Sequence, residues 1–236
     1  MITMVTELPN TPWFDTPLAK IHCSYSAYGN YGNLALFWQQ TNNSGDVTAV
    51  LSLTDFDMCI SESTADLCEL AEFVSVIAPK SIFTTLKTAV GLNLNILTNC
   101  TALEYKGKCS APPCENTYEG VEALYNKLRF GFTLPEYEVF MADISHRIRH
   151  NACSYVTTKY GAAAILTAKN CAVLTGIAVE QSMRKNGIGS ALLSRALSGI
   201  REKRILAVAE KDVLNFYIKN GFEVLEECAL AEGINE

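Results

Sequence analysis

The stretch Cys171–Arg201 reads CAVLTGIAVEQSMRKNGIGSALLSRALSGIR and decides the fold. Its first part, Cys171–Val179, is apolar and rich in branched residues, which is typical of a buried β-strand. A polar segment that contains glycine follows. The last part carries one apolar helix face, formed by Leu192, Leu193, Ala196, Leu197 and Ile200. The stretch therefore predicts a strand, a short loop and a helix.

The loop, RKNGIG over residues 184–189, has the composition of an anion site. Glycines allow a tight turn, and the first N–H groups of the following helix have no partner inside the helix, so they and the helix dipole favour an anion. Arg184 and Lys185 add positive charge, and each charge-assisted hydrogen bond to a phosphate contributes about 1.5–3 kcal/mol. An isolated Gly-x-Gly turn also begins ordinary helices, and the loop matches neither a Walker loop nor a dinucleotide fingerprint.

A second motif, KDVLNFYIKNGF, follows at residues 211–222. We predict a strand over Ile205–Ala209 and then a helix over Lys211–Asn220. Together the two motifs resemble those of the GNAT acetyltransferase superfamily. The family's loop pattern, Arg/Gln-x-x-Gly-x-Gly/Ala, is matched by Arg184, Gly187 and Gly189, and its Phe-Tyr-x-x-x-Gly-Phe pattern is matched by Phe216, Tyr217, Gly221 and Phe222. The resemblance covers Tyr118 to Cys228, about half of the chain.

The resemblance implies an α/β fold with a mixed central sheet flanked by helices, and acetyl-CoA bound between the fourth and fifth strands of that fold. Tyr217 matches the tyrosine that protonates the leaving thiolate in the family. No cysteine is placed as a covalent nucleophile, so we expect direct acetyl transfer to an amine in a ternary complex. The residues expected to bind acetyl-CoA are Ile177, Ala178, Val179, Arg184, Lys185, Asn186, Gly187, Ile188, Gly189 and Ser190. Gly176, inside the fourth strand, indicates a bulge or a close backbone approach.

The general base is less well defined by the sequence. Some family members use a glutamate on the fifth strand, but ILAVA at residues 205–209 has none. Glu180 is the nearest carboxylate in sequence, and a water chain is an equal alternative. Glu210 stands where the family often has asparagine, which is unusual beside an anionic cofactor.

Asp143 and His146 are candidate residues on the acceptor side, because the family places a helix beside the acceptor cleft. The alternative is structural: Asp143 and Arg147 are i,i+4 partners, and basic side chains suit the end of a helix. His22, on a predicted strand, is expected to be a packed core residue.

Composition limits the classes of function. The 236 residues carry a net charge of −6 and 49% hydrophobic residues, which suits a globular protein and argues against a nucleic-acid partner. No apolar run is long enough for a membrane span, and the first residues do not form a secretory signal. The nine cysteines lie mostly in apolar segments, so we expect free thiols in a reducing cytoplasm. Cys109 and Cys114 lack partners for a zinc site, and no metal is expected.

The N-terminal half is predicted to be an α/β domain, in which strands and helices follow an order similar to that of the C-terminal half. Between Ile60 and Ala65 it has neither glycine nor arginine, so no pyrophosphate loop is expected there. We predict a tandem GNAT-like fold with a degenerate N-terminal copy over 1–108, a linker over 109–117 and an acetyltransferase domain over 118–236; an unrelated α/β domain is the alternative. The predicted elements are strands Ile21–Ala27, Leu34–Gln40, Val47–Leu53, Phe56–Ile60 and Ser81–Thr85, helices Ser63–Ala78 and Leu86–Val90, and an extended Leu94–Tyr105.

The function predicted on these grounds is an acetyl-CoA-dependent N-acetyltransferase, a monomer or homodimer that acts on a small-molecule or peptide amine. The alternative is a non-catalytic coenzyme A sensor or interaction module, which the absence of a strand-five glutamate favours. A nucleotide-binding regulator is a third hypothesis, which preferential ATP or NAD binding would support. The identity of the acceptor amine is left open by the sequence.

Overall fold

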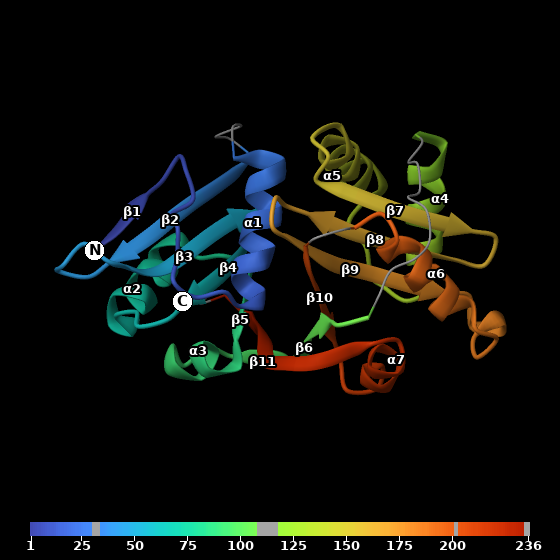
Figure 1. Cartoon of the computed structure of the whole chain (residues 1–236). Helices are drawn as coiled ribbons and strands as arrows, with labels where there is room; N and C mark the ends of the chain where they lie inside the picture. Colours follow the sequence, from blue (N-terminus) through green and yellow to red (C-terminus); the bar gives the residue numbers. More distant parts are fainter. Residues whose placement is uncertain (30–33, 108–117, 201–202, 234–236) are drawn as a thin grey trace. The chain divides into compact units, whose positions relative to one another are not determined.

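The computed structural model describes residues 1–29, 34–107, 118–200 and 203–233. The chain forms two compact units (Figure 1). The first unit consists of Met1–Leu103, Val208–Tyr217 and Val224–Glu236, and the second consists of Glu104–Ala207 and Ile218–Glu223. The predicted linker 109–117 lies outside the described residues. The division into 1–108 and 118–236 stays a prediction.

The first unit is built on a mostly antiparallel sheet. Its strands follow the order β1-β2-β3-β4-β5-β11, in which only the β4–β5 pairing is parallel. The strand β11 comes from the far end of the chain, and its residues Cys228–Glu232 pair with β5. The elements are β1 Ile2–Met4, α1 Thr16–Tyr28, β2 Ala35–Thr41, β3 Val47–Thr54, β4 Asp57–Glu62, α2 Leu67–Ile77, β5 Ser81–Thr85, α3 Leu86–Gly91, β6 Ile96–Tyr105 and β11 Phe222–Glu232.

Side chains alternate between the two faces of this sheet, as the two-residue period of a strand requires. On β4, Met58 and Ile60 are buried in the core that α2 covers with Leu70 and Val74. The intervening residues face α1: the Cys59 thiol donates a hydrogen bond to the Pro17 carbonyl oxygen at 3.3 Å. Helices therefore cover both faces of these strands.

The strands of the second unit follow the order β10-β9-β8-β7. The β9–β10 pairing is parallel, and the other two pairings are antiparallel. Helices α4 and α5 pack on one face of these strands and bury Val121, Leu124, Leu128, Phe140 and Ile144 against it. Helix α6 contacts β7, β8 and β9. The elements are α4 Tyr118–Leu128, α5 Tyr137–Arg149, β7 Cys153–Thr158, β8 Gly161–Thr167, β9 Cys171–Val179, the 3₁₀ turn η1 Gln181–Met183, α6 Ile188–Leu197 and β10 Arg204–Ala209. Helix α7, Leu214–Lys219, belongs mostly to the first unit.

Most predicted elements are confirmed, and one is wrong. The predicted strand Ile21–Ala27 is the second half of helix α1. The helix begins earlier, where the Asp15 side chain accepts a hydrogen bond from the Leu18 N–H and a proline occupies the first turn. His22 therefore lies on a helix and not on a strand; it is half-buried, and burial lowers its pKa.

Other elements also differ from the prediction, and the helix predicted from Lys211 begins only at Leu214. Helix α2 begins at Leu67 instead of Ser63, because Asp66 caps it by accepting hydrogen bonds from the Cys68 and Glu69 N–H groups. Strands β1 and β11 were not predicted. Within the described ranges no helix combines the length and apolar character that crossing a membrane requires, and no three His, Cys, Asp or Glu side chains converge as metal ligands would.

Candidate active site

Strand β9 pairs with β10 along its first four residues, and its pairing with β8 shifts register in the middle of the strand. Arg204–Ala207 of β10 pair with Cys171–Leu174. On the other side, Leu174 pairs with Ile165 but Gly176 pairs with Ala164, so Thr175 is an extra residue. This is a β-bulge, which bends a strand and re-aims its backbone. Gly176 follows the bulge directly, in accord with the expectation for a glycine in this strand.

The backbone beyond the bulge lies beneath the end of helix α4. A Cβ atom added to Gly176 would lie 3.2 Å from a Leu128 methyl carbon and 3.5 Å from the Phe132 ring. Ile177, Ala178 and Val179 continue the strand and pair with β8. The predicted acetyl-CoA-binding residues of β9 therefore continue the strand directly after the bulge, and Gly176 lies next to the end of α4 and to Phe132.

The loop after β9 turns through two left-handed residues. Lys185 has φ +66° and Gly187 has φ +77°. Gly187 is the N-cap of α6 and supplies no side-chain cap, and the first helical bond runs from the Ala191 N–H to the Gly187 carbonyl oxygen at 3.0 Å. The N–H groups of Ile188, Gly189 and Ser190 thus come before the first bonded turn. This helix start is open to an anion.

Helix α2 is the matched helix of the first unit, because it too follows the strand that pairs in parallel with the next one. Its N-terminus is closed by its own carboxylate: Asp66 Oδ1 lies 3.0 Å from the Cys68 nitrogen and 3.2 Å from the Glu69 nitrogen. A carboxylate in this position satisfies the amides that a phosphate would otherwise use. Of the two helix starts, only that of α6 is free of such a side chain.

Arg184 ties the loop to its surroundings. Its Nε donates to the Val179 carbonyl oxygen at 3.1 Å, and its Nη2 donates to the Phe130 carbonyl oxygen at 3.1 Å. A guanidinium has five N–H donors, so three have no acceptor among the residues that the structure describes. Arg184 is therefore able to position the loop and to meet an anion at the same time.

A family model described as an acetyltransferase (GNAT) domain matches residues 140–224. This segment is a GNAT domain. No curated protein sequence matches the chain at a significant level.

Solved structures resemble the chain over most of its length, at low sequence identity. A GCN5-related N-acetyltransferase from Kribbella flavida is 14% identical, with a TM-score of 0.59, over 80% of this chain and 88% of that one. One from Sphaerobacter thermophilus is 12% identical, with a TM-score of 0.57, over 93% and 94%. A tandem GNAT protein from the clavulanic acid biosynthesis pathway is 12% identical, with a TM-score of 0.53, over 86% and 84%. The predicted tandem GNAT-like fold is therefore confirmed.

Tyr217, near the end of the GNAT domain, lies in α7 and is only 6% exposed. The Phe216 ring meets it edge-on, with centroids 5.2 Å apart. Burial raises the pKa of Tyr217 to about 12. The phenol therefore keeps its proton at neutral pH, which a general acid requires.

The carboxylate candidates of the GNAT domain differ in their surroundings. Glu180 lies just after β9, and its Oε1 accepts a hydrogen bond from the Ser182 hydroxyl at 3.0 Å. Glu210 is exposed after β10. Glu180 is half-buried, so neither carboxylate is enclosed by the fold.

On α5, the i,i+4 pair expected from the sequence is present. Arg147 Nε donates to both carboxylate oxygens of Asp143, at 2.9 and 3.0 Å. The rings of His146 and His150 lie 4.5 Å apart. Asp143 therefore forms an ion pair with Arg147 within the same helix.

Proposed function

We propose that residues 118–236 are an acetyl-CoA-dependent N-acetyltransferase domain that transfers the acetyl group directly to an amine. Its co-substrate would bind along Ile177–Val179 and in the loop from Arg184 to Ser190. The single observation that carries the proposal is the open start of α6 after the bulged strand β9. That arrangement offers backbone amides to the diphosphate and a bent strand edge to the pantetheine arm.

The proposed chemistry needs a donor of one proton and a route for another. Tyr217 would protonate the departing thiolate, since its phenol is protonated at neutral pH. Glu180, or water beside it, would receive the proton from the amine. General acid–base help is worth about 10²–10⁴-fold, whereas holding both reactants in place can supply about 7–11 kcal/mol. Positioning by the strand and loop is therefore the larger contribution.

The acceptor would be a small-molecule or peptide amine, approached from the side of α5 that carries Asp143 and His146. The cytoplasm is the proposed location, because Cys23, Cys59, Cys68, Cys100, Cys153, Cys171 and Cys228 are free thiols in the described structure. Residues 1–108 would be a degenerate GNAT-like copy, joined by 109–117. The capped start of α2 supports that view, since a copy without an open helix start has lost its diphosphate site.

The experiment is a coenzyme A release assay with a panel of primary amines, on the wild type and on Tyr217→Phe. Amine-dependent release that falls about 10²-fold or more in the variant is expected for the enzyme. Acetyl-CoA binding without release by any amine would instead favour a non-catalytic coenzyme A sensor. This second function is favoured by the exposed Glu210, which stands in place of the asparagine common in the family.

A further inference from the structure

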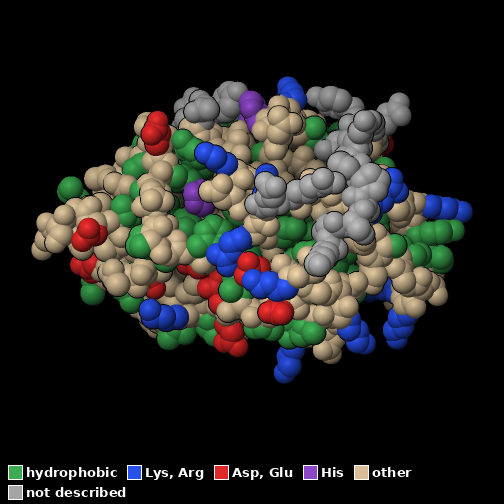
Figure 2. Space-filling model, in the orientation of Figure 1, with side chains coloured by type: hydrophobic (Ala, Val, Ile, Leu, Met, Phe, Trp, Pro, Cys, Tyr) green, Lys and Arg blue, Asp and Glu red, His purple; other side chains and the backbone are tan. Residues whose placement is uncertain are grey.

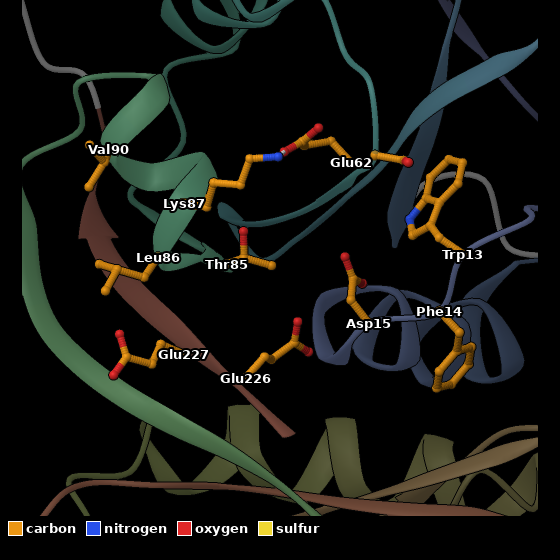
Figure 3. Close-up of a pocket in the computed structure, with 11 residues that line it drawn as sticks. Trp13, Phe14, Asp15, Glu62, Thr85, Leu86, Lys87, Val90, Glu226 and Glu227 are labelled. Atoms are coloured by element: carbon orange, nitrogen blue, oxygen red, sulfur yellow. Dashed lines mark ion pairs between the residues drawn. The ribbon is translucent and has the colours of Figure 1, made fainter. Parts of the chain in front are cut away.

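A cavity of about 700 Å³ lies in the first unit, within the roughly 300–1,000 Å³ range of small-molecule pockets. It opens where the parallel strands β4 and β5 end, and β11 and the segment before α1 complete its walls (Figure 3). In open α/β sheets, ligands bind beyond the carboxyl ends of parallel strands. None of the lining residues belongs to the 184–190 loop.

A buried carboxylate lines this cavity, that of Asp15, a residue that is 9% exposed. Its Oδ1 accepts hydrogen bonds from the Leu18 N–H and the Ser61 hydroxyl, both at 2.8 Å. Its Oδ2 accepts from no other residue in the described part of the chain. The carboxylate points into the cavity (Figure 3). Oδ2 therefore faces the open space of the cavity (Figure 3), where a bound ligand with an N–H group could donate a hydrogen bond to it.

A second carboxylate lies beside it. Glu226, on β11, accepts a hydrogen bond from the Thr16 N–H through Oε1 at 2.6 Å, and no described residue donates to its Oε2. Burial, and to a smaller extent the charge of Glu226, raises the pKa of Asp15 to about 6. At neutral pH Asp15 is therefore mostly ionised. Each of the two carboxylates has one oxygen that accepts no hydrogen bond from a described residue.

The cavity carries more negative than positive charge. Glu62 and Glu227 also line it, against the single lysine Lys87. The Lys87 ammonium lies 4.0 Å from Glu62 Oε1 and its side chain is 83% exposed, so it neutralises the cavity poorly. Acidic side chains also gather on the surface near β5 and α3 (Figure 2). An anionic ligand such as coenzyme A is disfavoured here.

The remaining walls are apolar. Two aromatic rings, Trp13 and Phe14, stand on one side, and Leu86 and Val90 stand on the other (Figure 3). Trp13 is held in place, because its indole N–H donates to the Ser61 hydroxyl at 2.8 Å. An aromatic wall next to a pair of carboxylates suits a cation with an apolar body.

We infer that this cavity binds a primary ammonium cation with an aryl or alkyl body, such as an arylalkylamine. The ammonium donates to Asp15 Oδ2 and Glu226 Oε2, and the body packs against Trp13 and Phe14. The N-terminal unit would thus hold an organic amine at the place where its strands end, with no use of the diphosphate loop.

The test uses 2-phenylethylamine as the probe, titrated into the full chain at pH 7.5 without acetyl-CoA. Trp13 emission reports the cavity, and Trp13→Phe leaves only Trp38, which is buried elsewhere, as background. Saturable binding with a change in Trp13 emission is expected, and 2-phenylethanol, which has the same shape without the charge, should bind at least tenfold more weakly. Equal binding of the alcohol would overturn the inference.

The variants are Asp15→Asn, which keeps a side chain suited to the N-cap of α1, and Glu226→Gln. Each should weaken the amine at least tenfold, while Glu72→Gln, an exposed charge change on α2, should leave binding unchanged. Melting curves verify that each variant is folded. Unchanged affinity in folded Asp15→Asn and Glu226→Gln would refute the site.

Two controls distinguish amine binding in this cavity from acetyl-CoA binding at the α6 loop and from metal binding. Binding should persist in Gly187→Trp, so it stands even if the acetyl-CoA loop proves inactive. If micromolar Ca²⁺ or Mg²⁺ displaces the probe and requires the same two carboxylates, the cavity is a metal site and the amine assignment is wrong.

Discussion

Asp15 should make the stability of the first unit depend on pH, and Asp15→Asn should remove that dependence. Burial, opposed in part by the hydrogen bonds from Leu18 and Ser61, raises the pKa of Asp15 from 3.8 to about 6. A carboxyl whose pKa is higher in the folded chain binds protons more tightly there. Its contribution to stability is therefore complete below pH 3.8 and is lost as the pH rises through about 6.

The magnitude follows from the pKa change. One pKa unit is worth about 1.4 kcal/mol, so the full loss is about 3 kcal/mol for this 9% exposed residue. Roughly 1 kcal/mol of it is already lost at pH 4.5, which leaves about 2 kcal/mol between pH 4.5 and 7.5. The asparagine keeps an acceptor for the Leu18 N–H but carries no charge, so the variant is expected to gain stability relative to the wild type over this range.

The measurement is urea unfolding of wild type and Asp15→Asn at pH 4.5, 5.5, 6.5 and 7.5. The free energy of unfolding of the variant minus that of the wild type should grow by about 2 kcal/mol from the lowest to the highest pH. Asp212→Asn removes an exposed carboxylate and should keep a profile parallel to that of the wild type. Parallel profiles for wild type and Asp15→Asn would refute the reasoning, because they would mean that the buried charge costs nothing.

Three further predictions concern single residues. Tyr217→Phe should lower kcat by about 10²-fold or more with little change in acetyl-CoA affinity, since it removes a proton donor and not a binding surface; equal loss in both quantities would contradict this. Gly161→Ala should cost about 1–3 kcal/mol in thermal unfolding, because the added methyl group collides with the Ala178 carbonyl oxygen, whereas at Gly131 the same methyl group makes an ordinary 3.5 Å contact and should be tolerated. Asp66→Ala should cost about 1 kcal/mol by uncapping α2, and Asp66→Asn much less; equal losses would exclude the cap as the cause.

The elements that could be predicted from the sequence are those whose signals are local. Strand β9 has the predicted bounds, because a continuous apolar run ends at a polar loop, and the open start of α6 follows from Gly187 within that loop. Helix α1 was misread because its alternating stretch from Ile21 resembles a strand, while its start is set by Asp15, outside that stretch.

The parts that could not be predicted depend on distant pairings. Strand β11 carries charges along its length and is stabilised by β5, a strand well over a hundred residues earlier in the chain. The amine cavity likewise joins Asp15 to Ser61 and Thr16 to Glu226, across 46 and 210 residues. No local pattern marks such contacts, so only the folded structure brings these groups together.

Binding of acetyl-CoA at the open start of α6 is tested by thermal unfolding with and without acetyl-CoA. Ligand at 100 times its Kd stabilises by about 2.7 kcal/mol, at roughly 2–4 °C per kcal/mol for a domain of this size. Wild type and Gly187→Asn, which tolerates the left-handed backbone, should shift by several degrees, and Gly187→Trp, which fills the loop, should not. If wild type fails to shift, or if Gly187→Trp shifts equally, acetyl-CoA does not bind at this loop and the proposed enzyme function falls.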